Sequence, residues 1–175
     1  MKTKLLSSIA AVGILSLSGC ATVTPMNNTF NPTEVEWVKE EGDSIVTGQS
    51  FLRTNGGSVV TCAGYEVSLV PVAPYSEERM TLIYGNQTKG YRSLNPFAGG
   101  KNPGDAPADY VSYTLNTICD ATGTFEFSDV PAGQYFITSG VTWNPTGDAI
   151  VPEGGYMMQR IDVKPSTEKK YILTH

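Results

Sequence analysis

Histidine is almost absent from this sequence, and cysteine is scarce. Among 175 residues there is one histidine, His175, together with three cysteines. A catalytic triad or a metal site with several histidines would depend on this one side chain at the end of the sequence. We therefore predict no metal, no cofactor and no histidine-based catalysis.

Charge is also sparse, and its sign is unfavourable for nucleic acids. Twelve basic residues face 17 acidic residues, so the net charge is −5. Proteins that bind nucleic acids usually carry a basic patch, and no such excess exists here. The 40% hydrophobic content is enough for a folded core. With 18 glycines and 11 prolines, the chain favours short strands and turns over long helices.

The longest apolar stretch lies near the start, from Leu5 to Leu17, and follows two lysines. At about 13 residues it is shorter than the roughly 20 that a membrane-spanning helix needs. A basic start, then an apolar stretch, then small residues is the sequence of features typical of a secretory signal. The sequence Leu17-Ser18-Gly19-Cys20 resembles the lipobox of bacterial lipoproteins.

The lipobox resemblance implies that residues 1–19 are a signal peptide and that Cys20 carries the lipid. Three acyl chains on one cysteine would hold a protein firmly to a membrane. Ala21 follows the cysteine in place of the aspartate that retains many lipoproteins at the inner membrane. We expect an outer-membrane anchor with the domain facing the periplasm. The mature chain would carry ten basic and 17 acidic residues, so the lipid must provide the attachment.

The mature sequence divides into a tether and a domain. Residues 20–33 are polar and interrupted by proline, which predicts a flexible tether. Residues 34–175 are predicted to form one domain. A short helix over Pro32 to Glu40 is favoured slightly over a strand. A second helix is predicted over Ser76 to Tyr84, and Gly85 would end it. Predicted strands span residues 44–54, 59–61, 65–71, 110–118, 124–127, 134–142, 156–163 and 170–174.

The segment from Asp120 to Tyr135 carries a recognisable pattern. A tight turn at Asp120 to Gly123 leads to Phe125 and Phe127, two apart on one face. This segment resembles the signature of carboxypeptidase regulatory-like domains. The resemblance implies an all-β fold, an antiparallel β-sandwich of about seven strands of the transthyretin type. It also implies a domain without catalytic activity of its own.

Two cysteines stay available once Cys20 is assigned to the lipid. In an oxidising compartment, Cys62 and Cys119 are expected to form a disulfide. The alternative is that both are buried free thiols. A nucleophilic role needs an activating base, which the sequence does not place near either cysteine. The acids Glu77 and Glu78 point about 100° apart on a helix, so they are not a catalytic pair.

Aromatic residues supply the candidates for ligand contact. Tyr91 and Phe97 lie in a segment from Asn86 to Asp109 that has no periodicity and is predicted to be a long contact loop. Trp143 ends a predicted strand. These rings either contact a ligand or pack against the sandwich, with Trp143 closing the core.

The leading functional hypothesis is a non-catalytic interaction or structural module of the cell envelope. Its partner would be an envelope protein or a glycan, reached from the membrane through the lipid. The alternative is a carbohydrate-binding module on a β-sandwich, with Tyr91, Phe97 and Trp143 as the contact residues. An enzyme is the third hypothesis and ranks last, because the sequence shows no coherent set of catalytic residues.

Overall fold

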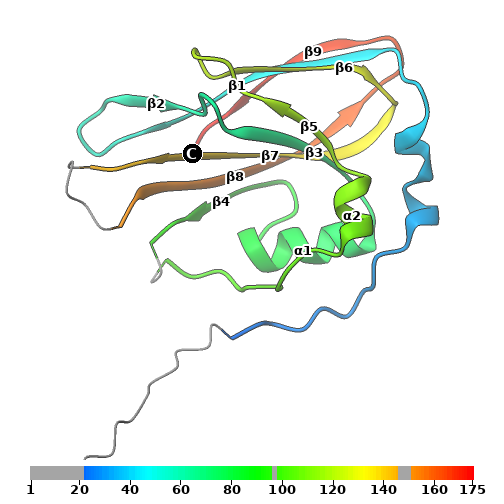
Figure 1. Ribbon diagram of the computed structural model, residues 1–175, viewed down its shortest axis with the longest axis horizontal. Helices are drawn as coiled ribbons and strands as arrows, with labels where there is room; N and C mark the ends of the chain where they lie inside the picture. Colours follow the sequence, from blue (N-terminus) through cyan, green and yellow to red (C-terminus); the bar gives the residue numbers. More distant parts are fainter. Residues whose placement is uncertain (1–21, 96–97, 146–150) are drawn as a thin grey trace, which may run out of the picture.

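Two β-sheets pack face to face, and two helices cover the outer side of one of them (Figure 1). The computed structural model describes residues 22–95, 98–145 and 151–175. Within these residues the chain forms nine strands, two more than the approximate number expected. The predicted all-β sandwich with short helices is confirmed.

The smaller sheet is built around β1 (Ser44–Arg53). This strand pairs antiparallel with β2 (Val59–Thr61) and β6 (Thr124–Val130). It pairs in parallel with β9 (Glu168–Leu173), where Ile45 is opposite Glu168. This parallel pair departs from the antiparallel arrangement of the other described strand pairs, because the chain crosses from β8 in the larger sheet to β9 in the smaller one.

The larger sheet has five strands, and all of its neighbouring strands are antiparallel. Its order is β4-β8-β7-β3-β5. In that order the strands are Lys89–Ser93, Glu153–Val163, Gly133–Trp143, Glu66–Pro71 and Leu115–Ile118. The pairing of β7 with β8 is the longest, from Gly133 opposite Val163 to Trp143 opposite Glu153.

The main core fills the space between the sheets. Alternate residues of β1 are buried, as expected for a strand with one face toward a core. Phe125 and Phe127 both point inward, as predicted, and are 2% and 6% exposed. Cys62 and Cys119 form a disulfide inside this core, with Cα atoms 5.7 Å apart. The predicted bridge is thus present, and the free-thiol alternative is wrong.

A second core lies on the outer face of the five-stranded sheet, beneath α1 (Pro74–Tyr84) and α2 (Ala108–Ser112). Phe136 and Met158 from the sheet pack there against side chains from the helices. Because both faces of β7 are covered, three consecutive residues from Tyr135 are buried. Helix α1 begins two residues before the predicted start and ends at Gly85, as expected.

The segment before β1 is not a flexible tether over its described part, residues 22–33. Phe30 packs edge-on against the rings of Tyr75 and Tyr110. The carboxylate of Glu78 accepts hydrogen bonds from the backbone and side-chain N–H groups of both Asn27 and Asn28. The predicted helix over 32–40 is present as two 3₁₀ turns, η1 (Pro32–Glu34) and η2 (Glu36–Lys39).

The predicted loop from Asn86 to Asp109 is wrong in two places. It contains the edge strand β4, and its last residues begin α2. Among the described strands, β4 pairs only with β8. It is partly polar, so its sequence lacks the alternation that marks a half-buried strand. The strand predicted from Tyr110 is shortened to β5, because Tyr110 is buried in the outer core as part of α2.

Candidate functional site

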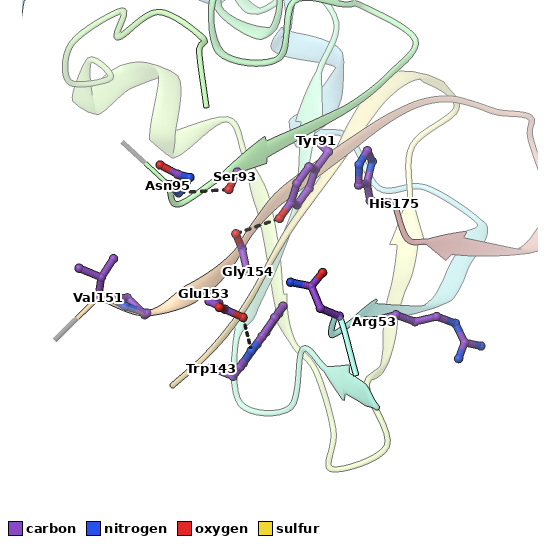
Figure 2. Close-up of a pocket in the computed structure, with 11 residues that line it drawn as sticks. Arg53, Tyr91, Ser93, Asn95, Trp143, Val151, Glu153, Gly154 and His175 are labelled. Carbon is purple, nitrogen blue, oxygen red and sulfur yellow. Dashed lines mark hydrogen bonds between the residues drawn. The ribbon is translucent and has the colours of Figure 1, made fainter. Parts of the chain in front are cut away.

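A cleft of about 670 Å³ opens at one end of the sandwich (Figure 2). Both sheets contribute to its walls, so the cleft is the mouth of the space between them. The residues that matter most for its chemistry are Asn55, Tyr91, Asn95, Trp143, Glu153 and His175.

The strand alternation carries aromatic side chains from the core into this mouth. Trp143 lies two residues beyond buried Val141 on β7, so both face the inside of the sandwich. Tyr91 is opposite buried Met157 in the pairing of β4 with β8. From the other sheet, His175 follows β9 two residues after buried Leu173. The cleft is therefore a continuation of the core that is open to solvent.

Tyr91 is held at both ends of its side chain. Its hydroxyl donates a hydrogen bond to the carbonyl oxygen of Gly154 at 2.9 Å. Its ring stacks on the imidazole of His175, with centroids 4.2 Å apart and planes 16° from parallel (Figure 2). These two contacts fix a flat aromatic wall that needs little ordering when a ligand binds.

Trp143 forms a second wall. Its indole N–H donates to Oε2 of Glu153 at 3.1 Å, across the directly paired ends of β7 and β8. The side chain is half-buried and packs against the main core. Trp143 therefore helps to close the core, as one interpretation predicted, while its contact with a ligand stays a prediction; its ring also lines the cleft.

Two glycines allow these strands to approach. Gly154 has φ of +106°, and a Cβ there would lie 2.1 Å from the carbonyl oxygen of Val141. A Cβ at Gly155 would lie 2.2 Å from the carbonyl oxygen of Arg92 and 2.8 Å from the Tyr91 ring. Side chains at these positions would push β4 and β7 away from β8. Sequence reasoning missed this role, although adjacent glycines inside a strand were the available signal.

The polar groups around the cleft are mainly neutral. Asn55 comes from the turn after β1, and Asn95 follows β4. The guanidinium of Arg53 extends away from the two aromatic rings (Figure 2). Glu153 has the single carboxylate side chain among the described lining residues.

The structure brings two of the three predicted contact residues together, since Tyr91 and Trp143 line the same cleft. Phe97 and the lipidation candidate Cys20 lie outside the described residues. His175, Glu153 and the glycines were not predicted as site residues. His175 could have been found only through the parallel pairing of β9 with β1, which the sequence did not indicate.

The acidic candidates have structural partners. Glu77 forms an ion pair with Arg160 at 2.8 Å, and Glu78 binds the N-terminal segment, so the two carboxylates do not converge. The Asp120 carboxylate accepts N–H bonds from Thr124 and Thr122, which closes the predicted turn. These bonds, that of Thr124 above all, hold the pKa of Asp120 below its usual value. No cluster suited to a metal ion occurs among the described residues.

Comparison with solved structures identifies a relative in fold. The chain is similar to the crystal structure of a Pseudomonas aeruginosa protein proposed to bind carbohydrate, with a TM-score of 0.71. The alignment covers 85% of this chain and 99% of that one, at 21% sequence identity. At this identity the likeness shows the fold and does not transfer a function.

Comparison of the sequence gave no further relatives. No family model and no curated protein matches the chain. Within the described ranges, none of the helices is both long enough and apolar enough to span a membrane.

Proposed function

We propose that this protein is a non-catalytic carbohydrate-binding module, with the cleft between Tyr91 and Trp143 as its binding site. The observation that carries the proposal is the position of Trp143, half-buried at the mouth of the sandwich with one side toward a cleft. The fold likeness to a protein proposed to bind carbohydrate supports the same assignment.

The lining of the cleft matches the two kinds of surface that a sugar presents. A pyranose ring has an apolar face of C–H groups and a rim of hydroxyls. The rings of Trp143 and Tyr91 provide flat apolar surface for the C–H face. The amides of Asn55 and Asn95 offer both donors and acceptors to the hydroxyls. A few placed polar groups within a mostly preformed cavity are typical of small-ligand sites.

The envelope location is part of the same proposal. The lipobox at Leu17 to Cys20 supports a lipid-anchored protein of the outer membrane that faces the periplasm. A glycan of the cell envelope would then be the natural ligand. Replacing Cys20 with serine should move the protein from the membrane fraction to the soluble periplasm. Retention of the Cys20→Ser protein in the membrane fraction would contradict the lipid anchor.

Fluorescence can test the binding site directly, because Trp37 and Trp143 are the two tryptophans of the chain. Trp37 packs against Tyr135 on the far side of the core, with ring centroids 5.1 Å apart. The Trp37→Phe variant therefore leaves Trp143 as the sole indole reporter. We expect its emission to shift during titration with peptidoglycan fragments and neutral oligosaccharides.

A pair of variants separates stacking from folding. Trp143→Ala should weaken glycan binding roughly 30-fold, the effect of losing about 2 kcal/mol at a binding hot spot. Tyr91→Phe keeps the ring and its stacking on His175 and removes only the hydroxyl that bonds Gly154, so it should weaken binding much less than Trp143→Ala does. Unchanged emission from Trp143 across the whole panel would refute the assignment of this cleft.

A further inference from the structure

A second cleft, of about 490 Å³, lies on the outer side of the five-stranded sheet, between α1, β4 and residues 98–104. Arg79, Arg92 and Lys101 line it, and no acidic residue does so among the described part of the chain. This concentration of positive charge is unexpected in a protein with a net charge of −5. Uncompensated cations around a concave surface attract anionic ligands.

The segment that carries Lys101 is fixed against its surroundings. The backbone N–H of Lys101 donates to the carbonyl oxygen of Leu82 at 2.9 Å. Nη1 of Arg92 donates to the carbonyl oxygen of Lys101 at 3.3 Å. A Cβ at Gly100 would lie 2.0 Å from this Nη1, so glycine is what lets the guanidinium pass beneath the segment. The Arg92 guanidinium and the backbone of Lys101 are therefore positioned before any ligand arrives.

Arg79 adds a second guanidinium to the lining of the cleft. Its Nη2 donates to the carbonyl oxygen of Gly104 at 2.9 Å. Its Nη1 is buried and has no hydrogen-bond partner among the described residues. The ion pairs found in the described structure use Arg160 and Lys164. The cations of this cleft are thus not neutralised by carboxylates of the protein.

We propose that this cleft binds an anion of the phosphate class. Guanidinium groups match the tetrahedral oxygens of a phosphate, and a lysine adds a point charge. The site adjoins the glycan cleft, since Ser93 and Asn95 line both, but the aromatic rings of Tyr91 and Trp143 do not line it.

The position of the cleft relative to the N-terminal segment suggests two sources of phosphate. Thr24 N–H donates to the carbonyl oxygen of Asn102 at 2.7 Å, and a Cβ at Gly104 would lie 3.2 Å from Val23. Val23 is three residues beyond Cys20, which limits their separation to about 11 Å. With the lipid anchor proposed above, the cleft lies within reach of lipid headgroups. A free phosphorylated compound is the other source.

The experiment uses residues 20–175 with Cys20→Ser, which removes the lipid and keeps every residue that the structure describes. One arm measures binding of inorganic phosphate by calorimetry. The other measures co-sedimentation with vesicles of phosphatidylglycerol and phosphatidylcholine, against phosphatidylcholine alone. The Arg92→Gln, Lys101→Gln double variant should weaken binding by about tenfold or more, because it removes two charge-assisted contacts.

A matched control separates a site from general electrostatics. The Lys169→Gln, Lys170→Gln variant removes the same charge from exposed positions on β9, in the other sheet, and should bind as the parent does. If the double variant at Arg92 fails to fold, Lys101→Gln alone serves, since this side chain is exposed.

Each outcome distinguishes the possibilities. Binding of phosphate without vesicles indicates a free phosphorylated ligand, and binding of anionic vesicles indicates a headgroup. Absence of both, or equal losses in the cleft and control variants, overturns the proposal. The Trp143 emission titration is independent of these charges, so a failure here leaves the glycan assignment intact.

Discussion

A buried hydrogen bond joins the two sheets across the main core. The hydroxyl of Ser50 on β1 donates to that of Ser139 on β7 at 2.8 Å. Ser50 is fully buried and Ser139 is 3% exposed. No other hydrogen bond of either hydroxyl occurs in the described structure. Replacing one serine with alanine therefore leaves a polar group unpaired between two apolar sheets.

The expected cost follows from this geometry. A buried hydroxyl that loses its partner destabilises a protein by about 1 to 3 kcal/mol. We expect this loss for Ser50→Ala and for Ser139→Ala separately. In the double variant no unpaired hydroxyl is left, and the stability should return to within about 1 kcal/mol of the parent. The two substitutions should thus be coupled by at least about 1 kcal/mol.

Urea unfolding without reductant keeps the disulfide intact and measures the free energy of unfolding of the four proteins of this cycle. Ser128→Ala provides the control, because this exposed serine should change stability by no more than about 0.5 kcal/mol. If the double variant loses the sum of the two single losses, the two hydroxyls do not interact and the inference is wrong. A changed slope with urea in any variant would show that the unfolded state also differs.

Three further predictions concern other parts of the molecule. Reducing the Cys62–Cys119 bridge, which closes 57 residues, should cost about 4 kcal/mol in a urea titration with and without reductant, and an unchanged midpoint would exclude that contribution. Because the pKa of Asp120 is lowered in the folded protein, this carboxylate stabilises the fold at pH values above its unfolded pKa near 3.8. The stabilisation is lost as the pH falls through the lower folded pKa. Asp120→Asn should therefore flatten the stability profile below about pH 4, and a parallel profile would contradict this. Glu78→Gln weakens the acceptor for Asn27, so proteolysis near residues 24–28 should accelerate, whereas equal rates would show that the Glu78 carboxylate does not hold the segment.

Much of the sandwich could be predicted because its strands obey local rules. The inward pair Phe125 and Phe127 follows a turn that the Asp120 carboxylate closes by accepting N–H bonds and in which Gly123 has a positive φ. The Gly123 φ is +79°, and its N–H donates to the carbonyl oxygen of Asp120 at 3.0 Å. Such elements depend on neighbours in sequence, and these neighbours are visible without a structure.

The outer layer could not be predicted in the same way. The N-terminal segment is polar, and its binding to Glu78 joins residues about 50 positions apart. Hydrogen bonds between one carboxylate and two asparagines at that separation produce no periodic pattern in the sequence. The strand β4 was missed because it is an edge strand, stabilised by pairing with β8 more than by its own sequence.

Two residues of the candidate site were predicted individually, but their meeting in one cleft was not. Tyr91 and Trp143 were chosen as aromatic side chains in suitable positions, 52 residues apart. Their meeting depends on β8, which pairs with β4 on one side and β7 on the other. His175 reaches the cleft only because β9 crosses to the other sheet. Long-range pairing decided the composition of the cleft, and a single sequence does not reveal it.

The parallel pairing of β1 with β9 also governs the order of assembly. During synthesis β1 is among the first strands to be made, and its partner β9 is the last. Until Glu168–Leu173 exists, one edge of β1 keeps unpaired N–H and C=O groups that can pair with other chains. Among the described strands, the smaller sheet is completed only once β9 has been made. Until then, this edge of β1 is open to aggregation.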